Sequence, residues 1–337
     1  VDAIAWSPKK NVLASLGDSG TIMLWDVANL QPHQQTSSPI AKLQSNGSNM
    51  LVWSPDGSMI AVGGAYTKNN DFNSSALYVY KGDLSDVVPG FPVAATGSNL
   101  INGLAWVQNK YVAIVNTPLD YIDKNQVQLI VVDPTNPKLQ IAPLAVNVGL
   151  LALGMSKTQG IVASPDSTQL AICTDYGLAL GQPQIAGQTL KWQASTKNLL
   201  TFNSEKLLNE VDAASWAPNG KTVIALDAGT SPGSTIVGWH WQDSNPQAMF
   251  LVSQGVALKL TTLAWCPAPT SSLIAAGSTK QDGSVYIWDI TKNRTPVRTL
   301  TSGIKADVVD LVWSSDGAWL AANYADTNAS TLIWKMR

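Results

Sequence analysis

The sequence has few charged residues. Lysine, arginine, aspartate and glutamate make up 13% of its 337 residues, and the formal net charge is −2. An average soluble domain carries about a quarter charged residues. Proteins that bind nucleic acid generally show a basic patch, and none is visible here. We therefore expect no nucleic-acid partner.

Cysteine and histidine are nearly absent, with two of each. Cys173 and Cys266 fall in different repeats, so we expect buried free thiols and no disulfide. The chain has no Cys-x-x-Cys pair and no Cys/His cluster, which argues against structural zinc. No apolar stretch reaches the roughly 20 residues that cross a bilayer, so we expect no membrane span within this chain.

A repeat is the strongest feature that the chain does have. Seven segments have the pattern of a strand. After the last residue of each one come a short turn and a second strand. The residues at that position are Trp6, Trp53, Trp106, Ala163, Trp216, Trp265 and Trp313, and they recur every 47 to 57 residues. A period near fifty with several strands per unit is typical of a β-propeller. We predict an all-β, seven-bladed β-propeller built from antiparallel four-stranded blades.

The repeat predicts one domain over residues 1–337. We place the blades at about 1–48, 49–98, 99–150, 151–208, 209–257, 258–305 and 306–337. The last unit offers three strands, at 308–313, 319–323 and 331–335, so its blade should be three-stranded with an exposed edge. In the fourth unit the third strand is placed at 190–192, although 177–180 also has the pattern of a strand. Because the chain begins inside a repeat, we expect it to be a piece of a longer protein.

Two dipeptides carry a resemblance to a known family. Trp25-Asp26 and Trp288-Asp289 stand at the end of a third strand, and the chain resembles the WD-repeat family of β-propellers. The matching positions elsewhere read Tyr80-Lys81, Val132-Asp133, Trp192-Gln193, Trp241-Gln242 and Trp334-Lys335. The family's Gly-His dipeptide is missing, so its tetrad of Asp, His, Ser or Thr, and Trp cannot form in any blade. The resemblance implies a scaffold for protein–protein interaction. These divergent repeats look like those of bacterial signalling proteins, some of which are sensor portions of protein kinases.

The tryptophan series could be an aromatic binding platform or part of the core. Each tryptophan ends an inner strand at the same phase, so we expect it to pack between neighbouring blades. Ala163 breaks the series, which predicts a thinner interface at the fourth blade. In the cluster Trp239-His240-Trp241, strand alternation sends both indoles to one face and His240 to the other. His240 is therefore expected to be exposed, with a general base or a metal ligand as the alternative.

Polar residues near the start of the inner strands predict a binding site at one mouth of the central tunnel. The candidates there are Asp2, Asn49, Asn102, Asp212, Thr261 and Asp310. Oxygens of Asp2, Asn49, Asn102 and Asp212 could hold Ca²⁺, but polar groups that bond backbone and trapped water are the favoured interpretation. Long loops between second and third strands should open on the same face, with Tyr66, Phe72 and Tyr121 as aromatic anchors.

No catalytic constellation is present: there is no Gly-x-Ser-x-Gly elbow, no phosphate-binding loop and no paired-histidine zinc motif. We therefore predict a non-catalytic module without a cofactor that binds a protein or a peptide. The alternative is a propeller enzyme, a hydrolase or an oxidoreductase, with a metal at the tunnel mouth.

Overall fold

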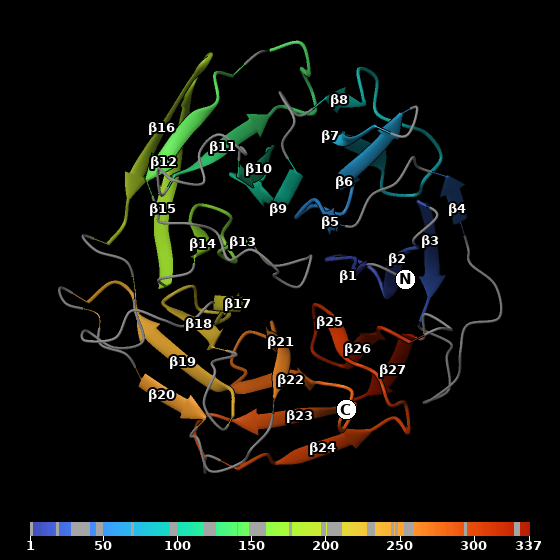
Figure 1. The fold of residues 1–337 in the computed structure, drawn as a ribbon, viewed down its shortest axis with the longest axis vertical. Helices are drawn as coiled ribbons and strands as arrows, with labels where there is room; N and C mark the ends of the chain where they lie inside the picture. Colours follow the sequence, from blue (N-terminus) through green and yellow to red (C-terminus); the bar gives the residue numbers. More distant parts are fainter. Residues whose placement is uncertain are drawn as a thin grey trace.

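Seven antiparallel sheets surround a central axis in a computed structural model of the chain (Figure 1). The residues that the structure describes are 3–17, 20–27, 41–44, 50–68, 71–94, 100–117, 126–139, 141–147, 160–174, 177–196, 200, 211–227, 233–243, 246, 249–252, 259–292, 295–326 and 331–337. Within them every regular element is a strand. We call each sheet a blade and number the blades in chain order.

The strands of each blade run outward from the axis in chain order. The innermost strands are β1 (Ala3–Trp6), β5 (Met50–Trp53), β9 (Leu100–Val107), β13 (Ile161–Ala163), β17 (Val211–Trp216), β21 (Leu260–Trp265) and β25 (Val308–Trp313). The second strands are β2 (Val12–Leu16), β6 (Met59–Lys68), β10 (Tyr111–Thr117), β14 (Leu170–Thr174), β18 (Thr222–Asp227), β22 (Leu273–Ser278) and β26 (Trp319–Tyr324).

The outer half of each blade follows the same order. The third strands are β3 (Thr21–Asp26), β7 (Asp71–Lys81), β11 (Gln126–Val132), β15 (Gly177–Ala186), β19 (Thr235–His240), β23 (Ser284–Asp289) and β27 (Thr331–Lys335). The rim strands are β4 (Ala41–Gln44), β8 (Val93–Ala94), β12 (Leu144–Asn147), β16 (Thr189–Ala194), β20 (Met249–Val252) and β24 (Arg298–Thr301). The prediction of seven blades is thus confirmed, including the three-stranded last one.

The core lies between the blades. Seven apolar clusters of buried residues fill the seven gaps between neighbouring sheets. Both faces of a blade are therefore covered, which explains why second strands such as β14 are buried at every residue. Among the described residues, the cluster between the seventh and first blades has 7 buried members, against 14 between the third and fourth.

The structure corrects our third strand in the fourth blade. That strand is β15, which pairs with β14 from Thr174 opposite Gly177 onward, and residues 190–192 belong to the rim strand β16. The burial of each segment gives the reason. Residues 177–181 are all buried, as an inner position requires, whereas in β16 only Leu190 is buried. Trp192-Gln193 is therefore not the counterpart of the Trp-Asp dipeptide.

The interface between the third and fourth blades is not thin, contrary to the expectation from Ala163. The long hairpin of β15 and β16 lies over the third blade, where Leu190 joins the shared apolar cluster and Ile185 and Trp192 pack against it. The side-chain amide of Gln108 also donates to the carbonyl of Pro183 at 2.8 Å. The outer strands thus supply the packing that a tryptophan at position 163 would give.

The two tryptophans of the Trp-Asp dipeptides differ in their polar contacts. The indole N–H of Trp25 donates to the hydroxyl of Ser15 on the neighbouring strand at 2.8 Å. The indole nitrogen of Trp288 is buried and has no hydrogen-bond partner. The Trp–Ser contact, which is one part of the family's tetrad, is thus present in the first blade, although no histidine completes the tetrad.

This difference predicts unequal effects of the same substitution. We expect Trp25→Phe to lower the free energy of unfolding by roughly 1 kcal/mol, because a hydrogen bond is lost. Trp288→Phe should be close to neutral, because removal of a buried unpaired donor offsets the lost volume. Urea unfolding of both variants measures this. Ser15→Ala should add nothing further in the Trp25→Phe background; an additive loss would contradict the contact.

Candidate functional site

The tryptophans that end the inner strands form a ring of hydrogen bonds. Five of them donate the indole N–H to the backbone carbonyl of the preceding blade's inner strand. These bonds are Trp6 to Val312 at 3.1 Å, Trp53 to Ala5 at 3.1 Å, Trp106 to Val52 at 3.3 Å, Trp216 to Val162 at 3.3 Å and Trp313 to Ala264 at 3.3 Å. Each accepting residue comes directly before the last residue of its inner strand. That last residue is a tryptophan, or Ala163 in the fourth blade. The geometry favours packing between blades over an aromatic platform.

The ring has two interruptions. Ala163 has no indole to donate toward the third blade. The indole N–H of Trp265 turns back to the carbonyl of Ser271 in its own blade, at 2.9 Å. A different hydrogen bond joins the fifth and sixth blades there. The hydroxyl of Ser215 in the fifth blade accepts the backbone N–H of Trp265 at 3.0 Å. Ser215 was not singled out from the sequence, since nothing local marks it as a link between blades.

A cavity of about 510 Å³ runs along the inner strands. Its walls are apolar for the most part, and Asp310 is the ionisable side chain among its lining residues. At one end lie the prolines of the first turns, Pro8, Pro55, Pro165 and Pro267. We call this end of the ring the turn face. The volume is within the range of small-molecule pockets, about 300–1,000 Å³.

Asp310 links the last blade to the first. One carboxylate oxygen accepts the backbone N–H of Ile4 at 2.9 Å, and the other accepts the N–H of Leu311 at 2.8 Å. The residue is 3% exposed. Burial raises the pKa of this carboxyl to about 7, against the opposing effect of its two N–H donors. Among the described polar residues nominated for the tunnel mouth, Asp310 is the one that lines the cavity, and the six tryptophans of the inner strands line it as well.

Three other nominated residues share one structural position. Asn102, Asp212 and Thr261 are each the extra residue of a β-bulge at the start of the innermost strand. A bulge bends its strand and re-aims the local side chain. The hydroxyl of Thr261 accordingly bonds the carbonyl of Val308 in the next blade. These residues therefore occur at equivalent places in their blades.

The structure gives less detail for the remaining nominated residues. Asp2, Asn49 and Tyr121 lie outside the described residues. Tyr66 and Phe72 are placed on strands β6 and β7, but their side chains are not described. Within the described part of the chain, no group of three or more histidine, cysteine, aspartate or glutamate side chains could hold a metal ion. The calcium site at the tunnel mouth stays an untested prediction.

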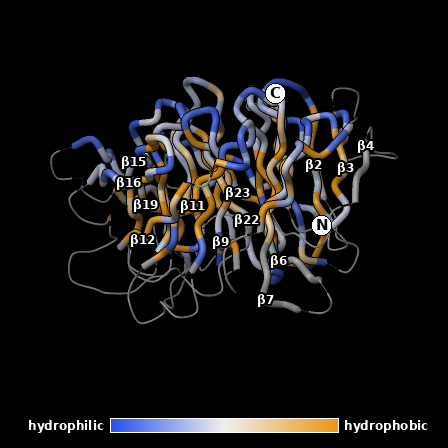
Figure 2. The backbone as a smooth tube through the Cα atoms, turned by 90° about the horizontal axis from the view of Figure 1, so that it is seen from above, coloured by the Kyte–Doolittle hydropathy of each residue, from blue (hydrophilic) through white to orange (hydrophobic). Residues whose placement is uncertain are grey.

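The segment 65–75 is part of a hairpin and not a loop. Strands β6 and β7 continue their pairing through Ala65 opposite Ser75 and Tyr66 opposite Ser74. The hairpin projects on the side opposite the C-terminus (Figure 2). Since the third strand β27 ends on the turn face, this opposite side is where second strands lead into third strands. We call it the hairpin face.

His240 ends strand β19 and is exposed, as predicted. Its Nδ1 lies 2.9 Å from the hydroxyl of Thr222 on the paired strand. Trp239 is buried, and Trp241 packs edge-on against Trp216 with ring centroids 6.2 Å apart. These contacts agree with the structural interpretation of the cluster.

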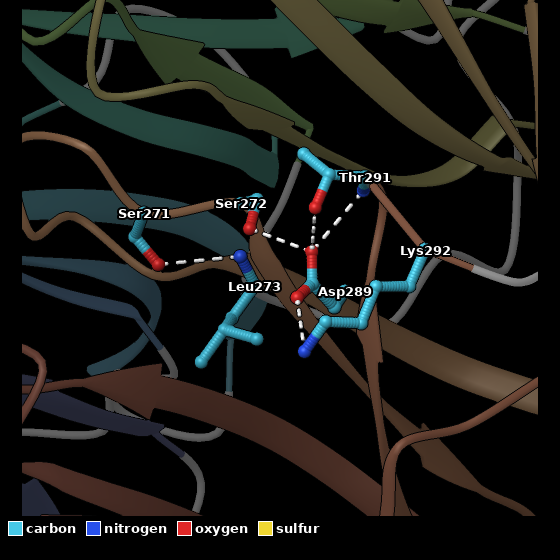
Figure 3. A network of polar contacts seen from close by, with 6 residues as sticks. All are labelled: Ser271, Ser272, Leu273, Asp289, Thr291 and Lys292. Atoms are coloured by element: carbon cyan, nitrogen blue, oxygen red, sulfur yellow. Dashed lines mark hydrogen bonds and ion pairs between the residues drawn. The ribbon is translucent and has the colours of Figure 1, made fainter.

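Asp289, the aspartate of the second Trp-Asp dipeptide, lies at the centre of a network of polar contacts (Figure 3). One of its oxygens accepts the hydroxyls of Ser272 and Thr291, both at 2.7 Å, and the other lies 3.1 Å from Nζ of Lys292. The hydroxyls of Thr291 and Ser272 hold the pKa of Asp289 well below its usual range. Asp289 thus fastens the turn after β23 to the start of β22, which is a structural role.

The comparisons with known proteins agree with this architecture. The family model described as WD domain, G-beta repeat, matches residues 1–26 and 257–289, and each segment ends at a Trp-Asp dipeptide. A chain in "Crystal Structure of Mitotic Checkpoint Complex" is similar over 100% of this chain and 89% of its own length, with a TM-score of 0.67 and 16% identity. The β-propeller domain of Cps50 (Swd1) from Myceliophteria thermophila is similar over 99% and 96%, with a TM-score of 0.66 and 16% identity. No curated protein matches the sequence.

Together these findings define the class of protein. The molecule is an all-β, seven-bladed β-propeller whose tryptophans and aspartates mainly hold the ring together. The WD domain, G-beta repeat model matches two segments of it, which lie in the first and sixth blades. Within the described residues, no helix is long and apolar enough to cross a membrane.

Proposed function

We propose that this propeller is a non-catalytic module that binds a protein or a peptide on its hairpin face. The observation that carries the proposal is the hairpin of β6 and β7, whose strands of 10 and 11 residues project from that face. The second and third strands of the sixth blade, by comparison, have 6 residues each. A rigid ring that carries a projecting hairpin can hold a partner without moving its own core.

In the described part of the chain, the polar and ionisable side chains discussed above make contacts that hold the fold together, which supports this proposal. The inner tryptophans donate to backbone carbonyls, and Asp289 and Asp133 each bond a turn threonine and a lysine. Both cysteines are buried, and burial raises the pKa of the Cys173 thiol. No specific observation favours the enzyme alternative. The solved relatives named above support the module as well, since one of them stands in a structure titled as a protein complex.

The finer proposal concerns the setting of the module. We propose a single propeller domain over residues 1–337 that works as the sensor or scaffold portion of a longer bacterial regulatory protein, such as a kinase. The support is the resemblance of its divergent repeats to those of such proteins. Asp2, Asn49, Asn102, Asp212, Thr261 and Asp310, with Tyr66, Phe72 and Tyr121, are the proposed binding residues.

Shortening the hairpin tests the binding surface. Residues 65–75 would be replaced by Asn-Gly, a two-residue turn that suits a hairpin closed by the Gly64–Ala76 pair. Peptides selected from a random display library on the wild-type protein are the probes, and calorimetry measures their affinity. We expect the shortened variant to lose at least tenfold in affinity while its melting temperature stays within a few degrees, because the core between blades is untouched.

The matched control changes the opposite face. Lys9 and Lys10 are exposed in the first turn, and the double variant Lys9→Ala/Lys10→Ala should bind the same peptides as the wild type does. Binding that survives removal of the hairpin and fails in the lysine variant would place the site on the turn face. Stoichiometric calcium in the purified protein, together with an activity that Asp212→Ala abolishes, would replace the binding module by the enzyme.

A further inference from the structure

The third strand of the seventh blade, β27, has an outer edge to which no strand of the described chain is bonded (Figure 1). In the part of the chain that the structure describes, the seventh sheet has three strands and the other six have four. The backbone N–H of Met336 donates toward β26, to the carbonyl of Ala318 at 2.8 Å. Because successive residues of a strand point to alternate neighbours, the N–H and C=O groups of Thr331 and Ile333 face the outer edge. A row of such groups is a template for a further strand.

The other six blades show which position of β27 an added strand would cover. Cross-strand pairing aligns the blades: Trp313 pairs with Leu320, Leu320 pairs with Trp334, and Thr331 lies three residues before Trp334. The same path through the other blades leads to Ile22, Leu77, Leu129, Leu178, Ile236 and Val285. All six of these side chains are at most 1% exposed. Thr331, by contrast, is only half-buried.

Each of these six residues has an aliphatic partner in the outermost segment of its blade. The pairs are Ile22 with Leu43, Leu77 with Val93, Leu129 with Leu144, Leu178 with Leu200, Ile236 with Val252 and Val285 with Leu300. Between Leu178 and Leu200 both backbone hydrogen bonds are made, each at 2.9 Å. A leucine or valine is therefore the residue that the fold places opposite this position.

The residues of β27 indicate a partner that is not permanently in place. The hydroxyl of Thr331 lies 3.3 Å from the side-chain oxygen of Asn323, so its polar group has a partner inside the blade. A β-branched residue of this kind suits a strand position that is wet without a neighbour and covered with one. A permanent fourth strand would favour an aliphatic residue here, as in the other six blades. Lys335 and Arg337 are exposed at the end of the edge, and two cations there favour an acidic partner.

We propose that the edge of β27 binds an extended peptide segment of a partner protein, which adds a fourth strand to the seventh blade. The backbone of this segment bonds Thr331 and Ile333, a leucine or valine stands opposite Thr331, and an acidic residue lies toward Lys335. In strand addition of this kind the main chain supplies affinity, and the alternate side chains supply specificity. The proposal is independent of the binding proposed for the hairpin of β6 and β7.

A peptide with the sequence of residues 295–302 and the substitution Pro296→Asp is the probe, because its Leu300 stands opposite Val285 in the sixth blade. We expect saturable binding to the wild-type protein that slows amide hydrogen exchange of Thr331 and Ile333 at least tenfold. The amides of Leu332 and Trp334, which face β26, should change less. The same peptide with Leu300→Ser should bind at least tenfold more weakly. Unchanged exchange at about 1 mM peptide would overturn the proposal.

A proline variant tests the edge from the side of the protein. Thr331→Pro removes an N–H that faces outward and leaves the pairing with β26, so the affinity for the peptide should fall at least tenfold. Thr299→Pro, on the exposed side of the outermost strand of the sixth blade, is the matched control and should bind as the wild type does. If Thr331→Pro does not fold, the exchange pattern of the wild type decides the matter.

Three results would assign the edge or the peptide differently and would overturn the proposal. Slow exchange of Thr331 and Ile333 in the free protein at every concentration would show that the chain itself covers the edge. Slow exchange that appears only at high protein concentration would show that a second copy covers it. Loss of peptide binding in the variant with the shortened hairpin would place the peptide on the hairpin face.

Discussion

Replacing Trp106 with alanine is expected to lower the free energy of unfolding by about 3–5 kcal/mol. The indole is 4% exposed and belongs to the apolar cluster between the second and third blades. Its N–H also bonds the carbonyl of Val52 on the neighbouring inner strand at 3.3 Å. Alanine would leave a large cavity and an unpaired carbonyl at one interface of the ring. Urea unfolding followed by circular dichroism measures the loss.

Phenylalanine at the same position provides the graded control. Trp106→Phe keeps much of the buried aromatic area and loses the hydrogen bond, so we expect a loss of roughly 1–2 kcal/mol. A loss under about 1 kcal/mol for Trp106→Ala would mean that the side chain does not pack in the core. That outcome would favour the aromatic platform that the sequence left as an alternative.

Gly160→Ala is expected to lower the free energy of unfolding by about 3 kcal/mol, the second largest effect. A Cβ atom at this position would lie 2.3 Å from the backbone carbonyl oxygen of Asn102 in the third blade. On the facing strand, a Cβ at Gly103 would lie 2.4 Å from Cγ2 of Ile161. The inner strands β9 and β13 thus approach closely where Ala163 stands in place of a tryptophan. Backbone cannot move aside as a flexible side chain can, so the substitution must separate the two blades.

Gly17→Ala is the matched control for this substitution. A Cβ there would meet the carbonyl oxygen of Thr21 at 3.7 Å, which is an ordinary contact. We expect its melting temperature to stay close to that of the wild type, while that of Gly160→Ala falls by several degrees. Equal melting temperatures for the two variants would show that the blades are not packed this tightly.

The features that the sequence predicted correctly are local ones. Alternation and the recurring turns located inner strands such as 308–313 and the three-stranded last blade. The phase of the tryptophans predicted their packing between blades, and strand alternation predicted an exposed His240. Each of these inferences needs only a few neighbouring residues and the period of a strand.

The features that the sequence did not predict depend on contacts between distant residues. Gly177-Leu178-Ala179-Leu180 and Leu190-Lys191-Trp192 both have strand patterns, and only their places in the sheet separate the inner strand from the rim. The hairpin at 65–75 has many polar residues and was read as a loop, because pairing between its two strands is not visible in composition. The sequence marks Asp310 only as a polar residue near the start of the last inner strand. Its bond to Ile4 joins residues 306 positions apart.

The central claim is that the tryptophan series holds the neighbouring blades of the ring together. Hydrogen exchange of the indole N–H groups, followed by ¹⁵N NMR on protein labelled at tryptophan, tests it most directly. We predict slow exchange for Trp6, Trp53, Trp106, Trp216, Trp265 and Trp313, because each indole donates to a backbone carbonyl. Rapid exchange of these six indoles in the folded protein would show that they face solvent, and it would contradict the account.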